Sequence, residues 1–186
     1  MSFVKYSLTA PRPSDHKVEV LRRSCCPALA EASLFTYGEE IAVTVRIAGL
    51  FHLKTYLEHQ EASSEDHRLR GGQVPEILGW LRRVTEAMDL AAEYLIEEKD
   101  ISLALEDLYF DAKEGPARLL LKSSDGTLIE GLISLCGEMY ALCPDSNADL
   151  VARRLRERNA EQLMERRTLL AYLSGWACEL NGQCGR

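Results

Sequence analysis

Residues 73–122 decide the fold, and they read QVPEILGWLRRVTEAMDLAAEYLIEEKDISLALEDLYFDAKEGPARLLLK. Over residues 73–97, apolar side chains recur every three or four positions, which predicts a long amphipathic helix. The apolar positions are Ile77, Trp80, Leu81, Val84, Met88, Ala91 and Leu95. Further on, two short apolar runs flank a turn that contains Gly115 and Pro116, so we expect a hairpin near residues 107–122.

The first part of the chain has the alternation that is typical of strands. Residues 3–9 and 17–21 each predict a short strand. Residues 33–37 and 41–47 are rich in β-branched and aromatic side chains, and the Gly-containing turn between them predicts a hairpin. Residues 50–59 follow with leucines at helical spacing and predict a short helix.

A polar segment over residues 61–72, which ends in two glycines, separates these two kinds of pattern. We therefore predict an α+β fold with a small N-terminal antiparallel sheet and a mainly helical C-terminal half. In this division, residues 1–70 form a β-rich lobe with a short helix, and residues 71–186 form a helical lobe with the hairpin. The same elements are also compatible with one compact domain.

The last third of the chain is strongly helix-forming. Residues 127–142 predict one helix with an apolar stripe. From residue 148 onward, Arg and Glu alternate at three- and four-residue spacing around one apolar stripe through Leu163, Leu170, Leu173 and Trp176. Interspersed charges of this kind favour a helix that packs on its own domain. Exposure of the stripe would instead indicate a surface for a partner.

Composition excludes several classes of protein. The net charge of −7 argues against a nucleic-acid binder, because phosphate neutralisation needs a basic face. No run approaches the roughly 20 apolar residues that cross a bilayer. The N-terminus lacks the basic and apolar segments of a secretory signal. We therefore expect a cytoplasmic protein that does not insert into a membrane.

Metal-ligand spacings are missing from the sequence. The six cysteines are Cys25, Cys26, Cys136, Cys143, Cys178 and Cys184. None of them forms the closely spaced pairs of zinc sites, and the four histidines never form an H-E-x-x-H or H-x-H pattern. We therefore expect neither a metal site nor a cofactor.

Three carboxylates, Asp100, Asp107 and Asp111, lie close together in the loop after the long helix. Carboxylate oxygens suit a divalent metal, so they are candidates for holding a metal-bound nucleotide. Aspartates also serve as caps and turn residues in solvated loops, and we favour this interpretation because no phosphate-binding motif accompanies them. Asp100 and Asp107 are thus the candidates for binding a cofactor, and no residue is assigned a catalytic role.

The stretch from about residue 29 to residue 121, half of the chain, resembles a bacterial family of uncharacterised domains. The matching segments are IAVTVRI at 41–47, LFHLKTYL at 50–57, EYLI at 93–96 and LEDLYFD at 105–111. These domains lie N-terminal to forkhead-associated domains in Gram-positive bacteria. The resemblance implies a pseudokinase-like fold, distantly similar to protein kinases and to the cytoplasmic pseudokinase-like component of type VII secretion systems.

The chain departs from a working kinase at each catalytic motif. By resemblance, Asp107 stands at the metal-binding Asn position and Asp100 is nearest to the catalytic Asp. However, Asp100 lies seven residues before Asp107, where the kinase motif has five. Lys17 is the only plausible strand lysine, no Gly-rich loop occurs in the first strands, and no D-F-G follows the second hairpin.

Three hypotheses follow from this pattern. The first is a non-catalytic, pseudokinase-like scaffold or signalling adaptor that binds a protein partner through the cleft between its halves or through its C-terminal helices. The second is a divergent phosphotransferase in which Asp100 and Asp107 surround a metal-bound nucleotide. The third is a structural protein that oligomerises through its C-terminal helices.

Overall fold

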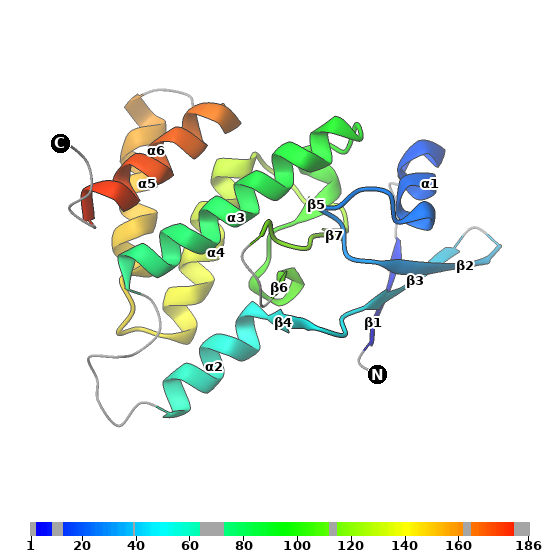
Figure 1. The fold of residues 1–186 in the computed structure, drawn as a ribbon, viewed down its shortest axis with the longest axis horizontal. Coiled ribbons are helices and arrows are strands. Elements are labelled where there is room, and N and C mark those ends of the chain that lie inside the picture. Colours follow the sequence, from blue (N-terminus) through cyan, green and yellow to red (C-terminus); the bar gives the residue numbers. More distant parts are fainter. Residues whose placement is uncertain are drawn as a thin grey trace.

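The computed structural model describes residues 3–8, 13–38, 40–63, 73–111, 115–161 and 165–180. It has a mixed α+β fold, with a three-stranded antiparallel sheet at the N-terminal end and a mainly helical C-terminal half that contains short antiparallel strand pairs (Figure 1). The predicted fold class is confirmed. Most of the predicted polar linker over residues 61–72 lies outside the described residues.

The N-terminal sheet has the strand order β1-β3-β2. Its strands are β1 (Phe3–Leu8), β2 (Ala32–Tyr37) and β3 (Glu40–Arg46). The strand predicted over residues 3–9 and the first predicted hairpin are therefore confirmed. Val43 is fully buried in the middle of β3, opposite Tyr6 on β1 and Leu34 on β2, so these three side chains share the face that points into the protein.

The strand predicted over residues 17–21 is wrong, because these residues belong to helix α1 (Asp15–Arg23). Val18 and Val20, on either side of Glu19, imitate the two-residue period of a strand. The two arginines in the last turn suit the dipole of a helix, and both form ion pairs with Glu19 at helical spacing. Over such a short run, the charges indicate the helix better than the apolar alternation does.

The helix predicted to start at residue 50 begins three residues later. Leu50–His52 form strand β4, and helix α2 (Leu53–Ser63) follows directly. Strand β4 pairs with β6 (Tyr109–Asp111), where Phe51 stands opposite Phe110 with 5.6 Å between the ring centroids. This long-range pairing explains the later helix start, which local spacing does not reveal.

Helix α3 (Val74–Glu93) confirms the long amphipathic helix. Ile77, Leu81 and Val84 are fully buried along one stripe, and a proline occupies the first turn. The helix ends at Glu93 rather than near residue 97. Leu95, which was expected on the apolar stripe, adopts a positive φ of 58° and is 70% exposed, so the chain leaves the helix axis there.

The arms of the second predicted hairpin meet in an antiparallel bridge, and each arm also pairs with a segment outside the expected hairpin. Short elements follow α3, namely the 3₁₀ helices η1 (Glu98–Asp100) and η2 (Leu105–Asp107) and the strands β5 (Ile101–Ser102), β6 and β7 (Leu120–Leu121). Strand β7 pairs with β5, and β6 pairs with β4. Among the residues that the structure describes, one isolated antiparallel bridge, between Tyr109 and Arg118, joins the two expected hairpin arms. Both arms therefore pair chiefly with segments outside the expected hairpin.

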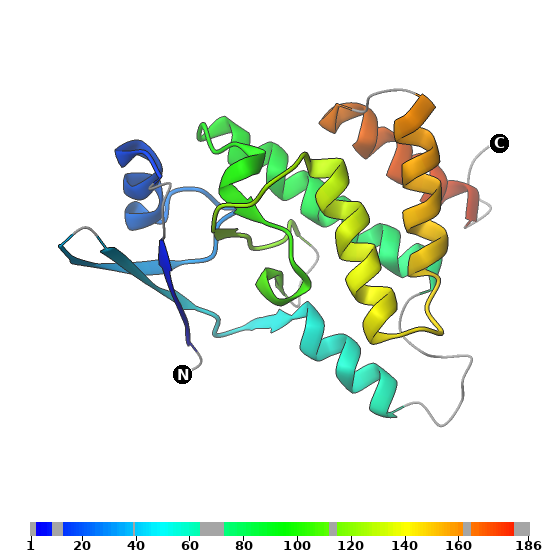
Figure 2. The same cartoon turned by 180° about the vertical axis from the view of Figure 1, so that it is seen from behind.

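The described residues after β7 form three helices, α4 (Leu128–Leu142), α5 (Ala148–Glu161) and α6 (Arg166–Leu180). Helix α4 confirms the prediction, and a capping box at Thr127 fixes its start. Helix α5 packs along α4, whereas α6 packs on α3 (Figure 2). Leu173 and Trp176 are buried and Leu170 is half-buried, so this stripe packs within the chain as we favoured; Leu163 lies outside the described residues.

Both halves contribute to one hydrophobic core, which includes Leu8 on β1, Val43 on β3, Val84 on α3 and Trp176 on α6. The domain boundary near residue 70 stays a prediction. Among the described residues, no helix combines the length and apolar character that crossing a membrane requires.

Candidate functional site

The loop between α3 and β5 and the chain after β7 form one polar region. The register of β5 and β7 places Ile101 opposite Leu121, so residues 97–100 lie beside residues 122–124. The hydroxyl group of Ser124 donates a hydrogen bond of 2.6 Å to the carbonyl oxygen of Ile101, and its backbone N–H donates one of 2.9 Å to the carbonyl oxygen of Lys99. These two hydrogen bonds fix the loop that carries Asp100 against the segment that follows β7.

Asp107 is buried and has two partners for one oxygen. Its Oδ2 accepts a hydrogen bond of 2.5 Å from the hydroxyl group of Ser102 and one of 2.8 Å from the ammonium group of Lys122. The Asp107 residue is only 6% exposed. A buried carboxylate is tolerated when it is paired and hydrogen-bonded, and both conditions are met here.

Burial and the negative charge of Asp107 raise the pKa values of two nearby tyrosines. Burial raises the pKa of the Tyr6 hydroxyl well above its ordinary value, and the negative charge of Asp107 raises it further. The pKa of Tyr109 is raised by the same two causes in the same order. Because Tyr6 belongs to β1, the inner face of the N-terminal sheet lies close to the Asp107 region.

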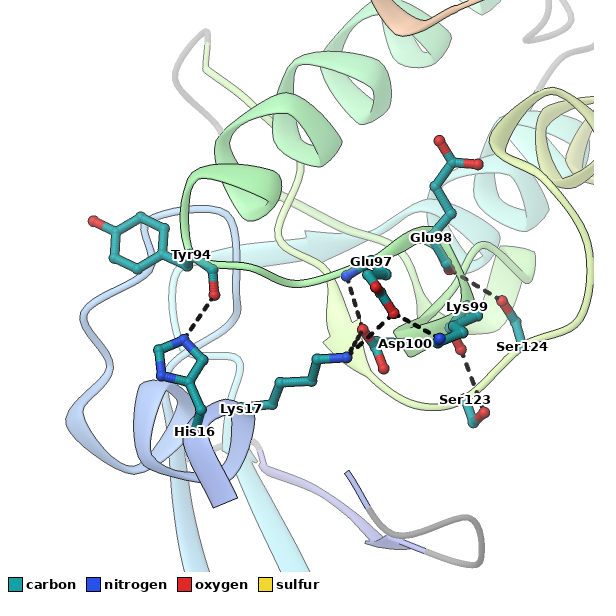
Figure 3. Close-up of polar contacts among 9 residues, drawn as sticks. All are labelled: His16, Lys17, Tyr94, Glu97, Glu98, Lys99, Asp100, Ser123 and Ser124. Atoms are coloured by element: carbon teal, nitrogen blue, oxygen red, sulfur yellow. Dashed lines mark hydrogen bonds and ion pairs between the residues drawn. The ribbon is translucent and has the colours of Figure 1, made fainter. Parts of the chain in front are cut away.

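Asp100 has a different cationic partner, from the N-terminal part of the chain. The Nζ atom of Lys17 lies 2.6 Å from its Oδ2, and the two side chains are 14% and 12% exposed. The same carboxylate accepts a hydrogen bond of 2.8 Å from the backbone N–H of Glu97 (Figure 3). Lys17, predicted on a strand, thus lies on α1, and it joins this helix to the loop.

Helix α1 has a second polar contact with the same region. A ring nitrogen of His16 lies 3.1 Å from the carbonyl oxygen of Tyr94, the residue that caps the C-terminal end of α3 (Figure 3). His16 and Lys17 are adjacent, so one turn of α1 contacts both the end of α3 and the carboxylate of Asp100.

The structure does not assemble the three predicted aspartates into a metal site. Asp100 and Asp107 bind different lysines, and Asp111 lies on β6. Across the described ranges, no group of three or more His, Cys, Asp or Glu residues is arranged to hold a metal ion. The favoured interpretation of a solvated loop is also wrong for Asp107, because this carboxylate is buried as an internal acceptor.

Comparison with known protein families and with curated proteins finds no match to this chain. The resemblance to the bacterial pseudokinase-like domains therefore stays a prediction from the quoted segments.

Sequence reasoning missed Ser102, Lys122 and Arg83. Nothing in the local pattern connects Ser102 with Lys122, because they meet only through the pairing of β5 with β7. Arg83 on α3 donates hydrogen bonds to the carbonyl oxygens of Gly115 and Asp111, the latter at 3.0 Å, and its guanidinium group lies 4.6 Å from the ring centre of Phe110. It therefore ties the end of β6 to Gly115.

Proposed function

We propose that this chain is a non-catalytic, pseudokinase-like scaffold or signalling adaptor that binds a protein partner. Its place of action would be the bacterial cytoplasm, in keeping with the resemblance to domains found beside forkhead-associated domains. It would need neither nucleic acid nor membrane insertion.

The ion pair between Lys122 and Asp107 carries this proposal. The resemblance places Asp107 at the position of a metal ligand. Here its carboxylate contacts the ammonium group of Lys122 at 2.8 Å and accepts a hydrogen bond of 2.5 Å from the hydroxyl group of Ser102. A divalent metal bound at Oδ2 would displace Lys122 and break the charge-assisted hydrogen bond between this lysine and Asp107. The internal cation therefore supports a structural use of Asp107.

Asp100 supports the same conclusion from another element. In a working kinase the corresponding carboxylate accepts the proton of the substrate hydroxyl group and must be open to it. Here Asp100 Oδ2 is shared between Lys17 and the backbone N–H of Glu97, and the side chain is 12% exposed. This carboxylate joins α1 to the loop after α3, which is a structural task.

Calorimetric titration of the purified chain with ATP and Mg²⁺ tests the proposal against the phosphotransferase alternative. The scaffold proposal predicts no saturable heat of binding. Saturable binding that disappears in the Asp107→Asn variant would overturn the proposal, because it would show that the carboxylate exchanges Lys122 for a metal-bound nucleotide.

A further inference from the structure

A groove of 1220 Å³ opens where the first turn of α6 meets the second half of α3 and the start of α4. Half-buried apolar side chains, Leu90 on α3 and Leu170 on α6, form part of its lining. Its volume exceeds the roughly 300–1,000 Å³ of ordinary small-molecule pockets. The groove is therefore large enough for a segment of a protein chain.

The groove is strongly acidic. Six carboxylates and two guanidinium groups line it, so its formal charge is −4. The carboxylates belong to Glu86, Asp89, Glu93, Glu98, Glu130 and Glu165, and the guanidinium groups to Arg166 and Arg167. The acidic side chains come from α3, from η1, from α4 and from the residue before α6, so they surround the groove from several sides.

Two of these carboxylates, Asp89 and Glu98, already interact with Arg166 of the same chain. Arg166 lies 3.9 Å from carboxylate oxygens of both Asp89 and Glu98, and it donates a hydrogen bond of 3.1 Å to the carbonyl oxygen of Met88. Glu98 also accepts a hydrogen bond of 2.7 Å from the backbone N–H of Leu128. Arg166 is thus an internal cation that holds α6 to α3.

Two carboxylates of the groove have no such partner. Glu93 and Glu165 are both exposed, and within the described part of the chain neither forms an ion pair. They lie on different elements, at the end of α3 and just before α6. A cationic ligand with apolar groups beside its charges could therefore contact both glutamates and the leucines between the helices.

We propose that this groove docks a basic amphipathic helix of the partner protein. Its Lys or Arg side chains would meet Glu93 and Glu165, and its apolar face would lie on Leu90 and Leu170. Residues of α3, α4 and α6 form most of the lining, so the mode of recognition is a helix in a groove rather than a strand added to a sheet. This inference rests on the proposed scaffold function and adds the chemistry of the partner.

The test uses two synthetic helical peptides of about 14 residues, or four turns. Both carry the same leucine stripe; one has Lys and Arg on the polar face, and the other has Glu. Fluorescence anisotropy with the whole chain is expected to show binding of the basic peptide alone, weaker at high salt. In the Glu93→Gln/Glu165→Gln variant, affinity should fall about tenfold, which corresponds to 1.4 kcal/mol.

The matched control is Glu31→Gln/Glu58→Gln, which removes the same net charge at exposed positions outside the groove. Its affinity for the basic peptide is expected to stay within twofold of the unmodified chain. An equal loss in both double variants, or no binding of the basic peptide, would overturn the groove assignment. Neither result bears on the scaffold proposal, which the titration with ATP and Mg²⁺ tests separately. Failure of the groove assignment can therefore be distinguished from failure of the scaffold proposal.

Discussion

Lys122 and Asp107 form an ion pair in which one partner is buried and the other is not. The distance from Nζ to Oδ2 is 2.8 Å, and the side chains are 42% and 9% exposed, respectively. Water can solvate the ammonium group if it loses its partner, but it cannot reach the buried carboxylate, so Asp107 depends on Lys122 more than Lys122 depends on Asp107. It also determines what happens when either residue is changed.

We predict that Lys122→Met destabilises the chain more than Asp107→Asn does. The first change leaves a buried carboxylate without its cation and should lower the free energy of unfolding by about 1–2 kcal/mol, less than the roughly 3–5 kcal/mol of a fully buried pair. The second leaves a half-exposed ammonium group that water can solvate, at a cost below about 1 kcal/mol. Urea unfolding of both variants measures the order, and the reverse order would contradict the role assigned to Asp107.

The ion pair between Lys17 and Asp100 should hold α1 against the rest of the chain. Because both side chains are largely buried, Lys17→Met is expected to lower the unfolding free energy by about 2–3 kcal/mol. Hydrogen exchange at the amides of Val18 and Leu21 should become faster. Lys99→Met is the control, since Lys99 is 69% exposed and should leave exchange in α1 unchanged. Equal effects in the two variants would rule out the proposed tie.

Alkaline conditions should destabilise the fold in a defined range. Burial raises the pKa of Cys136 from 9.0 to about 12. Between these values the unfolded chain releases the thiol proton while the folded chain keeps it, so stability is complete below about pH 9 and falls as the pH rises. The slope reaches at most about 1.4 kcal/mol per pH unit for one group.

Unfolding free energies of the unmodified chain and of Cys136→Ala, measured between pH 8 and pH 11, check this prediction. The variant loses some stability at every pH, but its curve should be flatter above pH 9. Tyr6→Phe should flatten the curve above pH 10 in the same way, because burial raises the pKa of Tyr6. Parallel curves for all three proteins would show that these groups are not buried as described.

Two glycines near α4 should respond in opposite directions to alanine. A Cβ atom at Gly137 would meet nothing within 4 Å, so Gly137→Ala is expected to stabilise this helix by up to about 1 kcal/mol. Gly126 has a φ of 98°, and a Cβ atom there would lie 3.0 Å from Oε2 of Glu130, the side chain that caps the helix. Gly126→Ala should therefore cost about 1–2 kcal/mol. Thermal unfolding measures both, and stabilisation by both would contradict the cap.

The sequence predicts the elements whose signals are local. Helix α3 and the hairpin of β2 and β3 follow from apolar spacing and turn residues, and Thr127 with Glu130 fixes the start of α4. Helix α1 was missed because Val18-Glu19-Val20 is too short for its period to distinguish a strand from a helix.

The candidate site depends on contacts that are distant in sequence. Asp107 and Asp100 could be selected as carboxylates in a polar loop, but their roles depend on Lys122 and Lys17. Lys122 reaches Asp107 only because β7 pairs with β5 rather than with β6, and Lys17 reaches Asp100 only because α1 packs at the end of α3. Neither packing arrangement leaves a pattern along the chain.

Thermal unfolding with and without ATP and Mg²⁺, on the unmodified chain and on Asp107→Asn, tests the central claim most directly. A ligand at 100 times its dissociation constant would add about 2.7 kcal/mol of stability, which such a measurement detects easily. If Asp107 is a structural acceptor, nucleotide leaves both melting temperatures unchanged, and the variant melts slightly lower with or without it. A rise in the melting temperature of the unmodified chain that Asp107→Asn abolishes would contradict the account.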